Sequence, residues 1–182
     1  MTGPSPDQAI VAGIRFPTEV ALERDEAGWT LVMRRPLRHS PEQVWRMLTE
    51  PDRLARWSPI VPDRSLAEVG PASCRENPGD EPIDAEVLVA DAPSLLVHRW
   101  GTALMRWTVT AVEEGTVLEL RQTCDDRTVA SSSAAGWRTC FGTLAATFDG
   151  VERERVIGPR ALDYGWQALH ERYEREFAGR QG

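Results

Sequence analysis

The histidine residues are the side chains of this sequence best suited to acid–base or metal chemistry. There are three, His39, His98 and His170, and they show no ligand spacing, so we expect no metal site. The motifs HExxH, GxSxG and GxGxxG are absent. All 21 basic residues are arginine, which excludes a Schiff-base lysine, a P-loop lysine and catalysis through pyridoxal phosphate. No cofactor is implied by these residues.

Three polar residues remain as candidates for an internal binding site: His98, Gln122 and Arg138. An inward histidine is either a hydrogen-bonded core residue or a group that reaches a ligand. Gln122 has the same two interpretations, with a neighbouring strand or a water as its internal partner. Arg138 either leans to solvent at the start of a helix or offers an anionic ligand a bidentate partner.

Alternating residues predict the strands that position His98 and Gln122. Four strands are expected over 83–90, 94–100, 103–112 and 116–124, and their short connections imply an antiparallel meander. A two-residue turn at Gly101 and Thr102 pairs His98 with Met105 on one face. The side chains expected to point inward are Leu96, His98, Trp100, Met105, Trp107, Val109, Leu118, Leu120, Gln122 and Cys124.

The segment before these strands predicts a hairpin and two short helices. Residues 19–37 alternate on both sides of a turn at 25–28. Ser40 caps a helix with Pro41 at its first position and Gln43 placed for a capping box, and a second helix covers 51–57. The stretches "SLAEVG" and "ASCREN" are typical of short strands, or of one bent strand.

Two helices are predicted near the end of the chain. After a serine cap in 131–133, apolar residues recur at helical spacing up to Asp149 and Gly150: Trp137, Phe141, Leu144 and Phe148. A last helix starts at Pro159 and carries the stripe Leu162, Trp166, Leu169, Tyr173 and Phe177. Because that stripe is apolar, we expect the last helix to pack on the rest of the chain.

Length, composition and charge set the broad class. The chain has 182 residues and a net charge of −7, which argues against a general nucleic-acid surface. No apolar run approaches the ~20 residues of a membrane span, and the N-terminus lacks the pattern of a signal peptide. Three cysteines without CxxC spacing indicate reduced thiols in the cytoplasm.

The order of elements and several motifs resemble one family. The matching stretches are "SPEQVWRMLTEPDRLARW", "EVLVADAPSLLVHRWG", "GTVLELRQT" and "AAGW", and "VIGPRALDYGWQALHERYEREF" resembles an extension of some bacterial members. Together they are similar to the SRPBCC (START-like) superfamily, in the branch of homologues of the heat-shock-protein-90 ATPase activator. The resemblance covers roughly residues 18–178.

The resemblance implies an α+β helix-grip fold, in which a curved antiparallel sheet wraps a long C-terminal helix around a cavity. We expect an N-terminal tail over 1–17, the helix-grip domain over 18–150 and a packed helical extension over 151–182. Trp45 should face the core and Trp57 the cavity mouth. The expected cavity residues are Trp57, His98, Trp100, Met105, Trp107, Leu120, Gln122, Trp137, Arg138 and Phe141. In extended members the position after "GW" is often histidine, so the arginine at 138 puts a family role there in doubt.

Three functions are consistent with these residues. The first is non-catalytic binding of a hydrophobic or aromatic small molecule, which the apolar inward faces favour. The second is a polyketide aromatase/cyclase-like enzyme, with His98 and Gln122 as acid/base and oxyanion donor. The third is a chaperone- or stress-related protein partner. The superfamily often dimerises, and a homodimer is one state that the sequence leaves open.

A binding role for His98 is preferred over catalysis. Its expected neighbours are apolar and supply no carboxylate to orient the ring, and burial would keep the imidazole neutral. We also expect Trp107→Ala to destabilise the fold more than Trp57→Ala, because only Trp107 is predicted on a central strand.

Overall fold

The computed structural model describes residue 3 and residues 5–179, and its main sheet is antiparallel with six strands in the order β1-β2-β9-β8-β7-β6. Its strands are β1 (Glu19–Asp25), β2 (Gly28–Leu37), β6 (Val87–Asp91), β7 (Leu95–Trp100), β8 (Ala103–Val112) and β9 (Gly115–Cys124). A second sheet contains β3 (Val61–Pro62), β4 (Ser73–Arg75) and β5 (Ile83–Asp84). The meander β6 to β9 confirms the predicted order, and His98 pairs with Met105 as expected. The single strand expected over 83–90 is instead divided between β5 of the second sheet and β6 of the main sheet.

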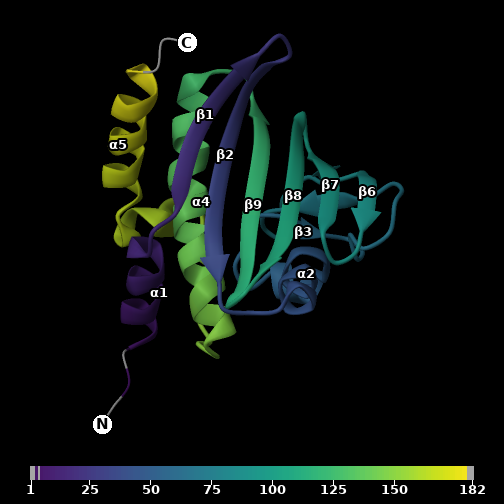
Figure 1. The fold of residues 1–182 in the computed structure, drawn as a ribbon, viewed down its shortest axis with the longest axis horizontal. Coiled ribbons are helices and arrows are strands. Elements are labelled where there is room, and N and C mark those ends of the chain that lie inside the picture. Colours follow the sequence, from purple (N-terminus) through teal and green to yellow (C-terminus); the bar gives the residue numbers. More distant parts are fainter. Residues whose placement is uncertain (1–2, 4, 180–182) are drawn as a thin grey trace.

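The helices form layers against the main sheet (Figure 1). They are α1 (Pro6–Arg15), α2 (Pro41–Thr49), α3 (Pro51–Leu54), α4 (Arg127–Phe148) and α5 (Trp166–Ala178), with a 3-10 helix η1 (Gly158–Tyr164) before α5. The long helix α4 lies between the sheet and a third layer made by α1 and α5. This arrangement is the α+β helix-grip fold, with α4 as the gripped helix.

The inward side of the sheet follows the predicted alternation. Met105, Trp107 and Val109 are buried, whereas Arg106 and Thr110, which point to the opposite face, are exposed. Trp45 lies in the core, as expected, and Ser40 caps α2 in a capping box with Gln43.

Two local predictions are wrong for identifiable reasons. The segment 65–70 is not a strand, because the Arg64 guanidinium donates to the carbonyls of Ser65, Glu68, Gly70 and Pro71 and draws the segment into a loop. The long helix does not start at a serine cap. It starts at Arg127, because the Asp126 carboxylate accepts the Val129 N–H and caps the helix earlier.

The last predicted helix is also divided. Residues 158–164 form a 3-10 helix, and Gly165, with a φ of 89°, ends it before α5 begins at Trp166. This break shifts the phase of the apolar stripe. Tyr173 and Phe177 are buried against the core, but Leu162 is 56% exposed instead of packed.

A helix that the sequence analysis did not predict lies within the segment assigned as an N-terminal tail. Ser5 caps α1 in a capping box with Gln8, and Ile10 and Ile14 are buried. Where α1 meets α4, Gly13 and Gly142 face each other. A Cβ atom on Gly13 would lie 2.7 Å from the Gly142 carbonyl oxygen, so only glycine permits this approach.

Candidate functional site

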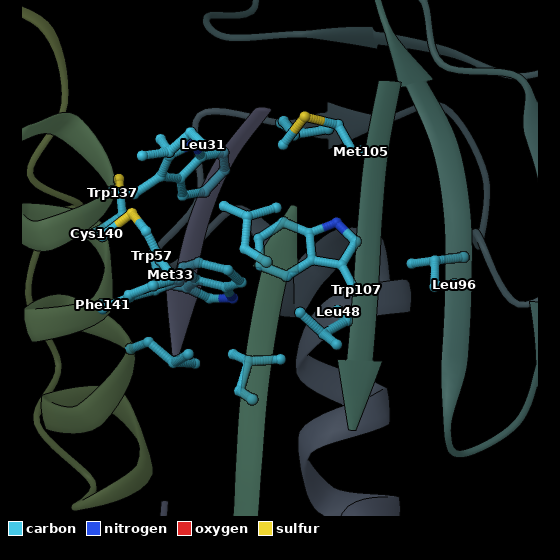
Figure 2. Close-up of a cluster of buried hydrophobic side chains, with 14 of the residues drawn as sticks. Leu31, Met33, Leu48, Trp57, Leu96, Met105, Trp107, Trp137, Cys140 and Phe141 are labelled. Atoms are coloured by element: carbon cyan, nitrogen blue, oxygen red, sulfur yellow. The ribbon is translucent and has the colours of Figure 1, made fainter. Parts of the chain in front are cut away.

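The space between the sheet and α4 is filled by aromatic side chains. We call Trp57, Trp107, Trp137 and Phe141 the aromatic core; their ring centroids lie between 5.3 and 6.5 Å apart (Figure 2). Edge-on and tilted contacts of this kind stabilise aromatic clusters. The residues that the sequence placed around a cavity therefore pack against one another.

The position predicted for Trp57 at a cavity mouth is wrong. The side chain is fully buried, and its Nε1–H donates to the Met47 carbonyl oxygen at 3.0 Å. The short turn after α3 directs the indole inward, onto Trp107 and Phe141. Trp57 thus belongs to the core, with its only polar atom satisfied.

Both ring nitrogens of His98 are engaged within the protein. The Trp107 indole can only donate, so His98 Nε2 accepts its Nε1–H at 3.0 Å. The proton therefore resides on Nδ1, which donates to the Arg99 carbonyl oxygen at 2.8 Å. Burial lowers the pKa of His98 to about 4, although the bond to Arg99 opposes this shift. His98 is a neutral core residue that orients Trp107.

Gln122 links the aromatic core to the surface of α4. Its Oε1 accepts the Trp137 Nε1–H at 2.7 Å, and its Nε2 donates to Ser133 Oγ at 3.2 Å. The amide orientation follows from the indole, which offers only a donor. Gln122 thereby fixes Trp137 and Ser133, two residues that lie on the wall of a surface cavity.

That cavity, which we call the outer pocket, has a volume of about 510 Å³. It lies between the N-terminal half of α4, Trp100 at the end of β7, and the segment 156–166. Three tryptophan side chains line it, namely Trp100, Trp137 and Trp166, with Pro159, Ala161 and Leu162 adding apolar surface. The wall of the outer pocket is thus largely apolar, but of the predicted cavity residues it contains only Trp100 and Trp137.

The polar groups of the outer pocket come from α4 and from β4's end. Ser132 Oγ lies 3.2 Å from His170 Nε2, and Trp166 stacks on the same imidazole with centroids 4.7 Å apart. Ser133 and Glu76 also line the pocket. This small polar set can orient a ligand whose main contacts are apolar.

The predicted site residues are thus divided by the structure. Trp100 and Trp137 line the outer pocket, whereas Met105, Trp107, Leu120 and Phe141 are packed in the core with Trp57, His98 and Gln122. Arg138 faces away from the sheet, where its Nη2 donates to the Ile14 carbonyl oxygen in α1. It follows the helical period, which rotates it away from its neighbour Trp137.

Sequence reasoning missed Trp166 and the connecting residues 156–162 as pocket walls. Trp166 was expected only as part of a packing stripe, and the connector has no periodicity to interpret. Within 5–179, no cluster of histidine, cysteine, aspartate or glutamate could hold a metal ion. In the same part of the chain, no helix is long and apolar enough to cross a membrane.

Comparison with known proteins identifies relatives of this fold. Residues 38–149 match a family model described as activator of Hsp90 ATPase homolog 1-like protein. A sequence comparison with curated proteins finds no match.

Three solved structures illustrate the structural similarity. CalU16 from Micromonospora echinospora has a TM-score of 0.65 and 20% identity, covering 86% of this chain and 95% of CalU16. EF2215 from Enterococcus faecalis, a protein of unknown function, has a TM-score of 0.72 and 15% identity, covering 98% of this chain and 100% of that one. DynU16, a protein in the dynemicin biosynthetic locus, has a TM-score of 0.59 and 22% identity, covering 69% of this chain and 50% of DynU16.

Proposed function

We propose that this chain, which belongs to the activator of Hsp90 ATPase homolog 1-like family, binds an apolar, aromatic small molecule in the outer pocket. The observation that supports the proposal is the composition of the wall, where Trp100, Trp137 and Trp166 surround about 510 Å³. A concave, mainly apolar site with few polar groups is typical of small-molecule binding.

Hydrogen bonding differs between the aromatic core and the outer pocket, and this difference supports ligand binding at the outer pocket. In the aromatic core, the indole N–H groups of Trp57, Trp107 and Trp137 all have acceptors in the protein. At the outer pocket, Ser132 and Ser133 each have one internal partner, and their hydroxyl groups keep further hydrogen-bonding capacity. A ligand with a hydroxyl or carbonyl group could use that capacity.

The similarity to DynU16 agrees with a role in small-molecule metabolism, since that protein comes from a biosynthetic locus. The three cysteines are free and buried, which agrees with the cytoplasmic location suggested by their number and spacing.

A pocket-filling substitution tests the proposal. Gly136 lines the outer pocket, and a Cβ atom there would meet only Trp166 Nε1, at 4.0 Å. The first side-chain atom of a leucine therefore fits at this position; the rest of the Gly136→Leu side chain should extend into the pocket, and the substitution should favour the helix. We expect wild-type protein to bind the uncharged probe N-phenyl-1-naphthylamine, measured by fluorescence, and Gly136→Leu to weaken binding at least tenfold.

Two control variants sharpen this test. Thr128→Leu adds the same side chain at an exposed position of α4 and should leave probe binding unchanged. His98→Gln alters the interior without touching the outer pocket and should also bind normally once folded. The proposed site would be contradicted if Gly136→Leu bound the probe as tightly as the wild type. It would also be contradicted if His98→Gln were the only variant that lost probe affinity.

A cyclase-like reaction in the same pocket is the second candidate, because an imidazole lies behind its wall. His170 is hydrogen-bonded to Ser132 and stands 3.7 Å from Glu174. In an enzyme, His170→Gln would abolish turnover while probe binding persists. If products of a candidate polyketide substrate are unchanged in this variant, the enzymatic alternative fails and ligand binding stands.

A further inference from the structure

Two buried arginines meet under the C-terminal end of α1. Arg35 from β2 and Arg138 from α4 are 2% and 6% exposed. Arg35 Nη1 donates to the Gly13 carbonyl oxygen at 2.7 Å, and Arg138 Nη2 donates to the adjacent carbonyl of Ile14. A helix C-terminus carries only about half a negative charge, so these bonds compensate the two cations incompletely.

Neither guanidinium forms an ion pair with a carboxylate in residues 5–179. Burial, with the nearby charge of Arg138, lowers the pKa of Arg35 to about 10. The Nε atoms of both arginines are buried without a hydrogen-bond partner, and the hydroxyl of Tyr173 lies beside the Arg138 guanidinium. Unsatisfied buried donors of this kind are costly unless a ligand engages their group.

A cavity of about 590 Å³ opens next to Arg138, and three more arginines line it: Arg15, Arg34 and Arg172. Arg34 is paired with Glu119 at 2.6 Å, and Arg172 with Glu176 at 2.7 Å. Arg15 forms no ion pair within the described part of the chain. Glu19, which lies 3.6 Å from Arg34, is the one carboxylate among the lining residues, so four guanidinium groups share the wall with a single carboxylate.

From this arrangement we propose that the cavity, which we call the arginine pocket, binds the phosphoryl group of an anionic small molecule. Guanidinium groups bind phosphate oxygens in a bidentate manner, and a dianion can accept from several of them at once. Arg138 would contribute a buried, fixed charge and Arg15 a free one. The site is distinct from the outer pocket and does not depend on the function proposed for it.

Calorimetric titration with inorganic pyrophosphate, at low ionic strength, tests this proposal. Wild-type protein should bind pyrophosphate with sub-millimolar affinity, and the affinity should fall as salt is added. Arg15→Gln and Arg172→Gln should each weaken binding about tenfold or more, as expected for charge-assisted hydrogen bonds. Both positions are exposed, so these variants should fold.

The matched control is Arg106→Gln, which removes one exposed guanidinium from the outer face of β8. It should bind pyrophosphate like the wild type. Arg138→Gln should abolish binding and lower the melting temperature; if it fails to fold, the two exposed positions decide. Equal loss in Arg15→Gln and Arg106→Gln would overturn the site, as would binding of citrate without binding of pyrophosphate.

The phosphoryl group could belong to a soluble metabolite or to a lipid. Co-sedimentation with phosphatidylcholine vesicles containing phosphatidic acid separates these sources. Sedimentation that requires Arg15, without pyrophosphate binding, would support the site with a lipid headgroup as its ligand. Absence of both pyrophosphate and vesicle binding would overturn the proposal.

Discussion

The aromatic core and the outer pocket are built from the same residue type, tryptophan, taken from different elements, with opposite results. In the aromatic core, Trp57 and Trp107 are almost fully buried, and their N–H groups have acceptors within the protein. At the outer pocket, Trp100 and Trp166 remain half-buried beside open volume. Tryptophan content therefore indicates neither packing nor binding by itself. The degree to which each ring is enclosed and hydrogen-bonded decides between them.

Removal of residues 159–182 should have the largest effect, because these residues contribute to both regions. Tyr173 and Phe177 are buried against the core, and Trp166 forms part of the outer pocket. Loss of two buried aromatic side chains should cost several kcal/mol, about 3–5 for each, and should lower the melting temperature strongly or prevent folding. Thermal denaturation followed by circular dichroism measures this. An unchanged melting curve would mean that α5 contributes nothing to the fold.

Single tryptophan substitutions should separate the two regions directly. In contrast to the expectation from sequence, Trp57→Ala should cost as much as Trp107→Ala, because both side chains are buried. Each should lower the free energy of unfolding by about 3–5 kcal/mol. Trp166→Ala, at the outer pocket, should cost clearly less while weakening probe binding. Urea denaturation gives the three values. If Trp166→Ala lowered the free energy of unfolding as much as Trp107→Ala, Trp166 would be a core residue and not part of a pocket wall.

The pH dependence of stability should report the enclosure of His98. Its pKa is lowered to about 4 in the folded chain, from about 6.5 in an unfolded one. Above about pH 6.5 the imidazole is neutral in both states, so its titration does not reduce the free energy of unfolding. As the pH falls from about 6.5 toward 4, protonation of His98 in the unfolded chain lowers the free energy of unfolding by up to about 1.4 kcal/mol per pH unit.

The His98→Gln variant serves as the control for this measurement. It lacks the titrating group, so denaturation between pH 7 and pH 4 should show a correspondingly smaller loss than in the wild type. Identical slopes for the two proteins would show that His98 titrates normally and is not enclosed.

Leu162→Ala should have the smallest effect on stability. The side chain is 56% exposed, so the free energy of unfolding should change by less than about 0.5 kcal/mol. Because Leu162 lines the outer pocket, probe affinity should nevertheless fall measurably. A large loss of stability with unchanged affinity would indicate that Leu162 packs like a core residue.

The sheet could be predicted from sequence because alternation has a short, regular period. An outward Arg99 places His98 inward, and the turn at Gly101 and Thr102 carries this face over to Trp107 on the next strand. An outward Glu119 likewise places Gln122 inward, because side chains alternate along a strand. The position of Arg138 could also have been predicted, because it follows Trp137 by one residue on a helix and must face another side. Trp57 could not, because it lies in an irregular turn after α3 that has no period.

Near the two ends of the chain, one feature could have been predicted from sequence and another could not. The sequence Ser5-Pro6-Asp7-Gln8 has the same cap pattern as Ser40-Pro41-Glu42-Gln43, so α1 could have been recognised. The outer pocket could not, because its wall comes from a connector and a 3-10 helix ended by a left-handed glycine. Such geometry depends on tertiary contacts more than on local preference.

The close approach of Gly13 and Gly142 has a consequence for how this sequence can diverge. The two helices touch backbone to backbone, so a side chain at either glycine would displace α1 and carry the Gly13 and Ile14 carbonyl groups away from Arg35 and Arg138. The two glycines and the two arginines should therefore vary together among homologues, although more than a hundred residues separate the first from the last. Homologues that keep both glycines should keep both arginines, and those that lose one glycine should be free to lose the rest.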